Sequence, residues 1–205
     1  ALAGAHTEYH YLPEAAPEGN WNVASFASGQ SPGTAWHVQE TDDGKELVQT
    51  FESKRKDTHP MVIAGRPEWE NYRLDTTFTP HGRTGRSGIV FRYRNSRCYY
   101  FFGLTAEGAR IIKVNHGSGY RLVTEDILAS ADFQWKTGRR YKASVTVDGE
   151  EIEARIEGLV ELDATDSTFA SGKIGLQSDA PTHYQRVTVS ALDEECYRVN
   201  ILRGK

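Results

Sequence analysis

The stretch Gly88–Leu104, GIVFRYRNSRCYYFFGL, decides the fold of this chain. Two runs of β-branched and aromatic residues flank the polar turn Asn95-Ser96-Arg97, a pattern that predicts a β-hairpin. Successive side chains of a strand point to opposite faces. The expected alternation is Ile89, Phe91 and Tyr93 on one face, and Val90, Arg92 and Arg94 on the other. The first face can join a core. The second offers two guanidinium groups, which suit carboxylates or vicinal hydroxyls, although it is equally well explained as a solvated outer face.

The composition is that of an ordinary globular domain. The 205 residues are 38% hydrophobic and 25% charged, and the net charge is −4 with Lys and Arg scattered along the chain. Surfaces that bind nucleic acid or anionic membranes need clustered basic residues, so neither partner is expected. The longest apolar stretch, Tyr99–Leu104, has the length of a strand and falls short of a membrane span. One well-buried domain is therefore expected.

The rest of the chain repeats the rhythm of short strands and turns. Tyr141–Val147 and Glu151–Glu157 alternate apolar and polar residues on either side of Asp148-Gly149, a strong hairpin signal. Helical periodicity is almost absent. Further alternating segments are Glu46–Phe51, Tyr72–Phe78, Ala109–Asn115, Tyr120–Thr124, Lys173–Gln177 and Gln185–Ala191. About ten short strands with frequent turns predict an all-β, two-sheet antiparallel sandwich.

The two ends of the chain suggest a module with flanking strands. His6–Leu12 and Cys196–Leu202 both alternate like strands, so we expect residues 1–19 to form an N-terminal strand and lead-in, 20–191 the main domain, and 192–205 a C-terminal strand that could lead to a further domain. Ala1-Leu2-Ala3 has the small-x-small pattern found before signal cleavage, which favours a secreted or periplasmic protein. The two cysteines, Cys98 and Cys196, leave a disulfide undecided.

Four motifs in this order resemble a known family. They are SGIVFRY at Ser87–Tyr93, YYFF at Tyr99–Phe102, the segment from Gly138 through Tyr141-Lys142 to Val147-Asp148-Gly149, and GKIGLQ at Gly172–Gln177. Together they resemble the concanavalin A-like jelly rolls, and within them the laminin-G-like group that includes the 3-keto-disaccharide hydrolase domains, over roughly Asn20 to Ala191. The resemblance implies a two-sheet jelly roll with a concave face that holds sugars. Such domains serve enzymes, carbohydrate-binding modules and adhesins alike.

The resemblance and the strand alternation together indicate a ligand site. The family's Ser-Gly-x-x-x-Arg segment falls on Ser87, Gly88 and Arg92, and its Ile-Gly-Leu-Gln segment ends at Gln177. Gly88 and Gly175 are expected to leave room for a ligand on the same face. Sugar rings stack on aromatic side chains, and Tyr99, Tyr100 and Tyr120, near the arginine hairpin or its neighbouring loop, could supply this contact. The expected ligand contacts are Arg92, Arg94, Gln177, Tyr100, Tyr120 and His116, while Trp36 and Trp135 are expected to be core residues.

The sequence supports neither a cofactor nor a metal ion strongly. Relatives carry an aspartate in the last strand that helps to hold a structural calcium ion, but the matching stretch here is His183–Val187, without a carboxylate. Asp42, Asp43 and Asp179 could supply oxygen ligands from loops. We expect them to be solvated loop acids, so structural calcium is doubtful.

Catalytic carboxylates are also not marked clearly. The nearest approach to a glucanase motif, Glu161–Asp166, is expected to lie in a loop, and Glu151, Glu153 and Glu157 are expected on a solvated strand face near Lys142. The sequence therefore predicts a non-catalytic carbohydrate-binding or accessory module of a glycan-degrading protein, with an oligosaccharide or polysaccharide as partner and a polar or acidic sugar as ligand. Two alternatives are a structural domain that docks on a neighbouring catalytic domain, and a glycoside-active hydrolase or lyase that uses Glu107, Glu125 or Asp179.

Overall fold

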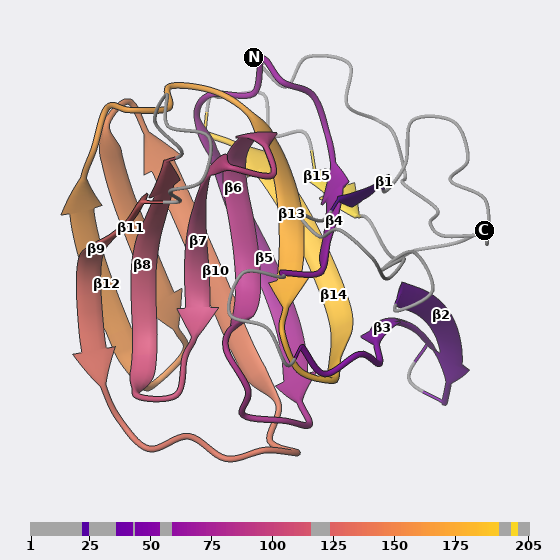
Figure 1. The fold of residues 1–205 in the computed structure, drawn as a ribbon. Coiled ribbons are helices and arrows are strands. Elements are labelled where there is room, and N and C mark those ends of the chain that lie inside the picture. Colours follow the sequence, from indigo (N-terminus) through magenta and orange to yellow (C-terminus); the bar gives the residue numbers. More distant parts are fainter. Residues whose placement is uncertain are drawn as a thin grey trace.

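The chain forms two antiparallel sheets packed face to face, as Figure 1 shows. The computed structural model describes residues 22–24, 36–42, 44–53, 59–115, 124–192 and 198–200. Every regular element within these ranges is a strand. The predicted all-β sandwich is confirmed, and no helix in the described ranges has the length and apolar character needed to cross a membrane.

Sheet A contains the hairpin that decides the fold. Its strands lie in the order β1 (Asn22–Ala24), β4 (Met61–Ala64), β13 (Lys173–Ser178), β6 (Ser87–Asn95), β7 (Cys98–Leu104), β8 (Gly108–Asn115) and β9 (Thr124–Asp132). Strands β6 and β7 pair around the expected turn, with Asn95 opposite Cys98. Strand β13 pairs with both β4 and β6. The Ser-Gly-x-x-x-Arg segment on β6 and the Ile-Gly-Leu-Gln segment on β13 are therefore neighbours in space.

Sheet B covers one face of sheet A. Its strands lie in the order β12 (Val160–Thr165), β11 (Glu151–Ile156), β10 (Tyr141–Asp148), β5 (Tyr72–Pro80), β14 (Thr182–Ala191), β3 (Gly44–Gln49) and β2 (Trp36–Thr41), and β15 (Arg198–Asn200) also pairs with β14. The Asp148-Gly149 hairpin joins β10 to β11 as predicted. The segment Glu161–Asp166 was expected to lie in a loop, but most of it belongs to strand β12, whose Val160 and Leu162 face the core.

The main core fills the space between the two sheets. Phe78 of sheet B stacks on Tyr184 with ring centroids 5.6 Å apart, and Phe91 stacks on Tyr100 within sheet A at 5.3 Å. Trp135 is buried, and its indole N–H donates to the carbonyl of Thr105 at 2.6 Å. The expectation that Trp36 and Trp135 are core residues is confirmed.

A second hydrophobic cluster lies on the outer face of sheet A, which is turned away from sheet B. Its members all come from sheet A, and Tyr93 packs against them: Met61, Ile63, Val90, Tyr99, Phe101, Ile112 and Val114. These side chains are almost fully buried, although a sheet face away from the core would ordinarily meet water. The outer face of sheet A is therefore a second, smaller interior.

A bulge in β6 changes the expected alternation of the hairpin. The register between β6 and β7 shifts between Phe91 and Asn95, and Arg92 has a positive φ of 46°. Because a bulge shifts the side-chain period by one residue, Tyr93 joins Val90 on the outer face. The expectation that Tyr93 shares a face with Ile89 and Phe91 is therefore wrong.

The two glycines expected to leave room for a ligand have a packing role. A Cβ on Gly88 would overlap the carbonyl oxygen of Phe102 on the neighbouring strand, and a Cβ on Gly175 would meet the side chain of Ile63 at 2.5 Å. The glycines let adjacent strands approach closely. The space above Gly175 is filled by protein and does not form a groove.

Candidate functional site

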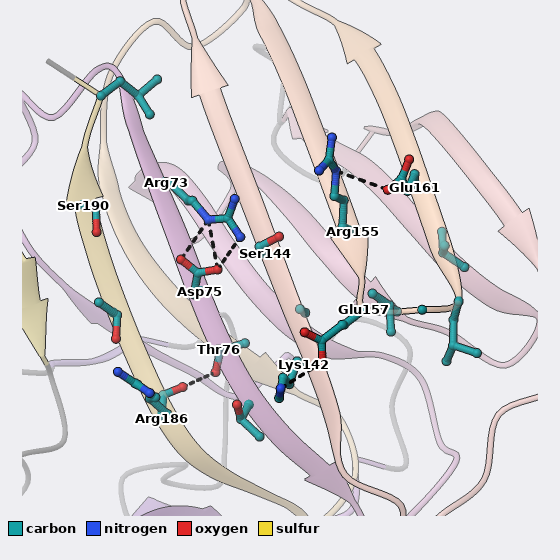
Figure 2. Close-up of a pocket in the computed structure, with 18 of the residues that line it drawn as sticks. Arg73, Asp75, Thr76, Lys142, Ser144, Arg155, Glu157, Glu161, Arg186 and Ser190 are labelled. Carbon is teal, nitrogen blue, oxygen red and sulfur yellow. Dashed lines mark hydrogen bonds and ion pairs between the residues drawn. The ribbon is translucent and has the colours of Figure 1, made fainter.

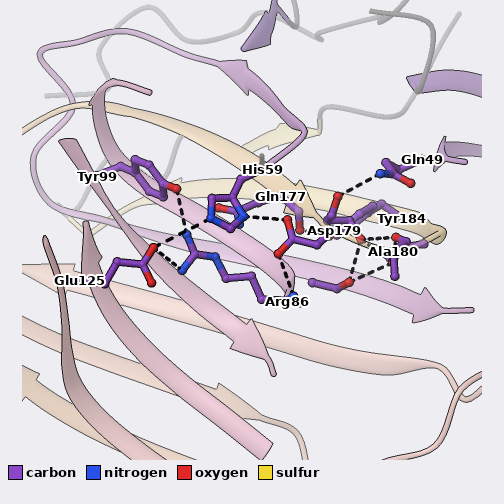
Figure 3. A network of polar contacts seen from close by, with 12 residues as sticks. Gln49, His59, Arg86, Tyr99, Glu125, Gln177, Asp179, Ala180 and Tyr184 are labelled. Atoms are coloured by element: carbon purple, nitrogen blue, oxygen red, sulfur yellow. Dashed lines mark hydrogen bonds and ion pairs between the residues drawn. The ribbon is translucent and has the colours of Figure 1, made fainter. Parts of the chain in front are cut away.

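A network of polar side chains crosses the outer face of sheet A (Figure 3). Arg86 directly precedes β6, Asp179 directly follows β13, and His59 precedes β4. Tyr99 lies on β7, Glu125 on β9 and Gln177 on β13. We call these six residues the outer-face network. Because they come from five separate segments of the chain, only the folded sheet brings them together.

Arg86 is the centre of the network. Its Nη1 donates to Glu125 Oε1 at 3.0 Å, and its Nη2 donates to the Tyr99 hydroxyl at 3.0 Å. The guanidinium also lies 5.0 Å from the centroid of the Phe101 ring. Burial lowers the pKa of Arg86, but the fields of Tyr99, Glu125 and Asp179 outweigh this effect and hold the pKa above its usual value. Arg86 therefore stays positively charged while its guanidinium packs against the apolar ring of Phe101.

Asp179 holds the second half of the network. Its Oδ2 accepts from the backbone N–H of Arg86 at 3.0 Å, and its Oδ1 lies 2.9 Å from His59 Nδ1. The other ring nitrogen, His59 Nε2, lies 4.0 Å from Glu125 Oε1. A proton on Nδ1 suits the contact with Asp179, and this tautomer leaves the Nε2 lone pair free. Asp179 thus orients the His59 ring across the gap towards Glu125.

Gln177 is the most unusual member of the network. Its side chain has no exposed surface, and its Cα pairs with Gly88 on one side and Met61 on the other. Within the described part of the chain, neither its amide nitrogen nor its amide oxygen has a hydrogen-bond partner. A buried polar group without a partner costs about 1–3 kcal/mol. A bound ligand or a buried water molecule would complete the hydrogen bonds of such a group.

Tyr99 adds a neutral hydroxyl to the network. Burial raises the pKa of Tyr99 to about 12, so the phenol keeps its proton at neutral pH. Its oxygen already accepts from Arg86, which leaves its O–H able to donate to a further acceptor. The network therefore combines donors, acceptors and one charge pair beside the apolar ring of Phe101.

Two of the residues expected to contact a ligand are instead buried structural groups. Arg92 has no exposed surface, and its guanidinium donates to the carbonyls of Phe169 at 3.0 Å, Glu70 at 3.2 Å and Gly149 at 2.6 Å. Tyr100 is equally buried, and its hydroxyl donates to Asp166 Oδ1 at 2.5 Å. The bulge turns the Arg92 side chain away from the outer face, and Tyr100 belongs to the main core, so neither residue belongs to the site.

The other expected contacts divide between the surface and segments that are not described. Arg94 is exposed, with its guanidinium 5.9 Å from the Phe169 ring, away from the outer-face network. His116 and Tyr120 lie outside the described residues. Among the expected contacts that the structure describes, Gln177 lies in the network, and so does Tyr99, one of the tyrosines expected to stack on a sugar.

Sequence reasoning missed Arg86 and His59. Both precede a strand, where side-chain alternation does not assign a face, and neither belongs to a motif that marks a site. Glu125 and Asp179 were candidate acids for an enzyme, and they lie on either side of His59. Glu107, the third candidate, contacts Thr105 at the β7–β8 turn instead.

The described residues do not form a metal site. They contain no group of three or more His, Cys, Asp and Glu side chains placed to hold a metal ion. Of the loop acids considered for calcium, Asp42 is exposed, Asp43 lies outside the described residues, and both oxygens of Asp179 are engaged by His59 and Arg86. Cys98 is a free thiol, and Cys196 lies outside the described ranges.

The outer face of sheet B carries an open groove of about 1000 Å³ (Figure 2). Six of its seven charged side chains pair with one another: Arg73 with Asp75 at 2.8 Å, Lys142 with Glu157 at 2.9 Å and Arg155 with Glu161 at 3.7 Å, and the seventh is Arg186. None of the described residues that line it is aromatic. The groove therefore resembles a solvated sheet face, and the expectation that Glu157 is solvated near Lys142 is confirmed.

The fold and the outer-face network define a class of protein: a concanavalin A-like jelly roll with a polar site on one sheet face. Residues 17–190 match the model of the 3-keto-alpha-glucoside-1,2-lyase-like domain. The chain belongs to this family, as the sequence motifs indicated. No curated protein sequence matches the chain.

Solved structures share the fold at low sequence identity. A carbohydrate-binding module, CBM66, from Bacillus subtilis has a TM-score of 0.61 and 17% identity, covering 82% of this chain and 94% of the module. A GH16 protein of the Bacteroides ovatus mixed-linkage glucan locus has a TM-score of 0.55 and 9% identity, with 87% and 84% covered. The GH43 protein BlXynB from Bacillus licheniformis has a TM-score of 0.52 and 15% identity, with 86% and 41% covered.

Proposed function

We propose that this chain is a carbohydrate-binding domain whose outer-face network holds a polar sugar. The observation that carries the proposal is the fully buried Gln177 side chain, whose amide nitrogen and oxygen lack partners within the described residues. Vicinal sugar hydroxyls can each donate and accept, so one pair can satisfy both amide atoms. Arg86 and Tyr99 offer further polar contacts, and Phe101 offers an apolar ring.

Family membership and fold support this proposal. The family is described by chemistry on a glucoside, and the Bacillus subtilis module with the same fold is a carbohydrate-binding protein. A role as an accessory module beside a catalytic domain, and export from the cytoplasm, fit the same proposal. The proposal keeps the expected division of the chain into residues 1–19, 20–191 and 192–205.

A panel of neutral and uronate-containing oligosaccharides, measured by isothermal titration calorimetry, tests the proposal. We expect saturable binding by the wild type and a loss of about tenfold or more in Gln177→Leu, because the apolar side chain cannot bond a hydroxyl. Arg155→Gln, in the groove of sheet B, is the control and should bind like the wild type. Absence of binding to every sugar, or full binding by Gln177→Leu, would contradict the proposal. A second titration in EDTA shows whether binding needs a metal ion.

One observation favours a second candidate function, an acid–base lyase in the same site. His59 Nδ1 lies 2.9 Å from the buried Asp179, and Nε2 faces the partly exposed Glu125 at 4.0 Å. A base oriented by a carboxylate in this way can remove a proton. In a 1,2-elimination, Nε2 would take the proton at C2 of a 3-keto-glucoside while the C1–O bond breaks and a C1=C2 double bond forms, with a protonated acid supplying the leaving group's proton.

Turnover assays separate the two candidates. An unsaturated keto-sugar released from a 3-keto-glucoside by the wild type, and not by His59→Gln, would establish the lyase. Sugar binding without any released product would leave the binding function alone.

A further inference from the structure

Three cationic side chains lie at one end of the sandwich, where the β5–β6 and β9–β10 connections meet. Both connections are at the lower end of the two sheets in Figure 1. The N–H of Gly138 donates to the carbonyl of Pro80 at 2.8 Å, which joins the two connections. Arg83 lies on the first connection, Lys136 and Arg139 lie on the second, and all three are exposed. We call these three residues the basic end patch.

Two buried aromatic rings support the patch. The guanidinium of Arg83 lies 4.6 Å from the centroid of the Trp135 ring, and its Nη1 donates to the Trp135 carbonyl at 3.2 Å. The guanidinium of Arg139 lies 5.4 Å from the centroid of the Tyr141 ring. The backbone N–H of Lys136 donates to the Tyr141 hydroxyl at 2.8 Å, so the two rings are neighbours. An arginine stacked on an aromatic face is already ordered, so it loses little conformational freedom when it binds an anion.

The patch has no acidic partner among the residues that the structure describes. None of its three side chains forms an ion pair there. Three carboxylates of neighbouring segments are bonded to other side chains: Asp132, Glu107 and Glu52. Neighbouring like charges repel each other, and a ligand with several negative charges would remove this repulsion.

We propose that the basic end patch binds an acidic polysaccharide, whose carboxylate or sulfate groups pair with the two guanidiniums and the Lys136 ammonium. A planar guanidinium can bond such an oxyanion through two N–H groups. A polymer that repeats its charge along the chain can engage all three cations at once. This inference goes beyond the outer-face network and stands whether or not that network binds sugar.

The surroundings of the patch favour a polysaccharide over a protein or a single-stranded nucleic acid. Protein interfaces bury an apolar centre. The large hydrophobic side chains exposed by the described residues are Ile127, Leu159 and Leu192, and none of them lies on the two connections. Single-stranded nucleic acids stack their bases on accessible aromatic rings, whereas Trp135 and Tyr141 are each only 3% exposed.

Fluorescence anisotropy of end-labelled oligogalacturonate tests this inference. We expect saturable binding at low salt that weakens by about tenfold or more in about 0.5 M NaCl, because salt screens exposed charges. The methyl-esterified oligomer has the same sugars without the charge and should not bind. A parallel titration with dextran sulfate distinguishes sulfate from carboxylate as the source of the charge.

Two triple variants with the same change in net charge locate the binding surface. Replacement of Arg83, Lys136 and Arg139 by glutamine should weaken binding by about tenfold, because three exposed charge pairs are lost and each is worth a factor of about 1.5 to 5. The control replaces three cations that already pair with acids: Lys45→Gln, Arg66→Gln and Lys142→Gln. It should bind like the wild type. Thermal unfolding of both variants checks that they are folded.

Equal affinity of the two triple variants would overturn the inference, because the polymer would then bind elsewhere. Failure of both acidic polysaccharides to bind would overturn it too, as would tighter binding of a DNA duplex than of either polysaccharide. Failure of every neutral sugar to bind would count only against the function proposed for the outer-face network.

Discussion

Gln177 occupies a position where a sheet face packed with Val90 and Phe101 would ordinarily hold an aliphatic side chain. The side chain is completely buried, and its amide has no partner among the described residues. Gln49 is equally buried but donates from Nε2 to the carbonyl of Ser178 at 2.9 Å. The two glutamines thus form a matched pair, one with a structural hydrogen bond and one without.

This pair gives a prediction about stability. Gln177→Met should leave the free energy of unfolding unchanged or raise it by about 1 kcal/mol, because an apolar side chain of similar volume replaces an unsatisfied amide. Gln49→Met should lower it by about 1–2 kcal/mol, because the Ser178 carbonyl loses its donor. Urea denaturation of both variants measures the difference. A Gln177→Met protein less stable than Gln49→Met would show that Gln177 has a structural role.

Arg92 gives the opposite prediction. Arg92→Ala should lower the free energy of unfolding by about 2–4 kcal/mol, because three carbonyls lose a charged donor and a cavity remains. Arg94→Ala, on the exposed side of the same strand end, should change it by less than about 0.5 kcal/mol. Thermal unfolding of the two variants compares them. Equal melting temperatures would contradict the structural role assigned to Arg92.

The segment Asp166–Phe169 is the element that ties the β12–β13 connection to sheet A. Asp166 Oδ2 lies 2.7 Å from Lys113 Nζ, and Oδ1 accepts from the Tyr100 hydroxyl. Burial raises the pKa of Asp166, but the hydrogen bonds from Lys113, Thr168 and Tyr100 outweigh it and hold the pKa well below its usual value. The ionised carboxylate of Asp166 is therefore the form that stabilises the folded state.

The sign of this shift predicts how stability depends on pH. Since the folded pKa lies below the unfolded value of about 3.9, the stabilisation is complete above that pH and is lost as the pH falls through the folded pKa. Asp166→Asn should cost about 1–3 kcal/mol at pH 7 and less at pH 2.5. Denaturation at both pH values measures this, with the exposed Asp163→Asn as control. A cost that does not shrink in acid would count against the assigned hydrogen bonds.

Local patterns predict most strands, but not the positions where the pattern changes. The Asp148-Gly149 and Asn95–Arg97 turns are visible because turn residues separate alternating segments. Strand β12 was missed because its acidic residues resemble a loop, although Val160 and Leu162 keep the period of two. The bulge at Arg92 leaves no local signal, and a shift of one residue moves every later side chain to the other face.

At the scale of the whole molecule, each of the two sheets has an outer face that points away from the main core. The outer face of sheet B is polar, and its charges pair with their neighbours. The outer face of sheet A carries buried apolar side chains, and the outer-face network lies among them. The site could not be found from sequence alone, because Arg86, His59 and Asp179 meet only through the strand order β4-β13-β6 in sheet A.

The side-chain amide of Gln177 offers the most direct test of the account. Its resonances in a two-dimensional 1H–15N NMR spectrum can be assigned by their loss in Gln177→Leu. During titration with the oligosaccharide that binds best in the panel, these resonances should shift saturably, with the same Kd as calorimetry. Saturable shifts elsewhere in the protein while the Gln177 amide stays unchanged would contradict the claim that the outer-face network is the sugar site.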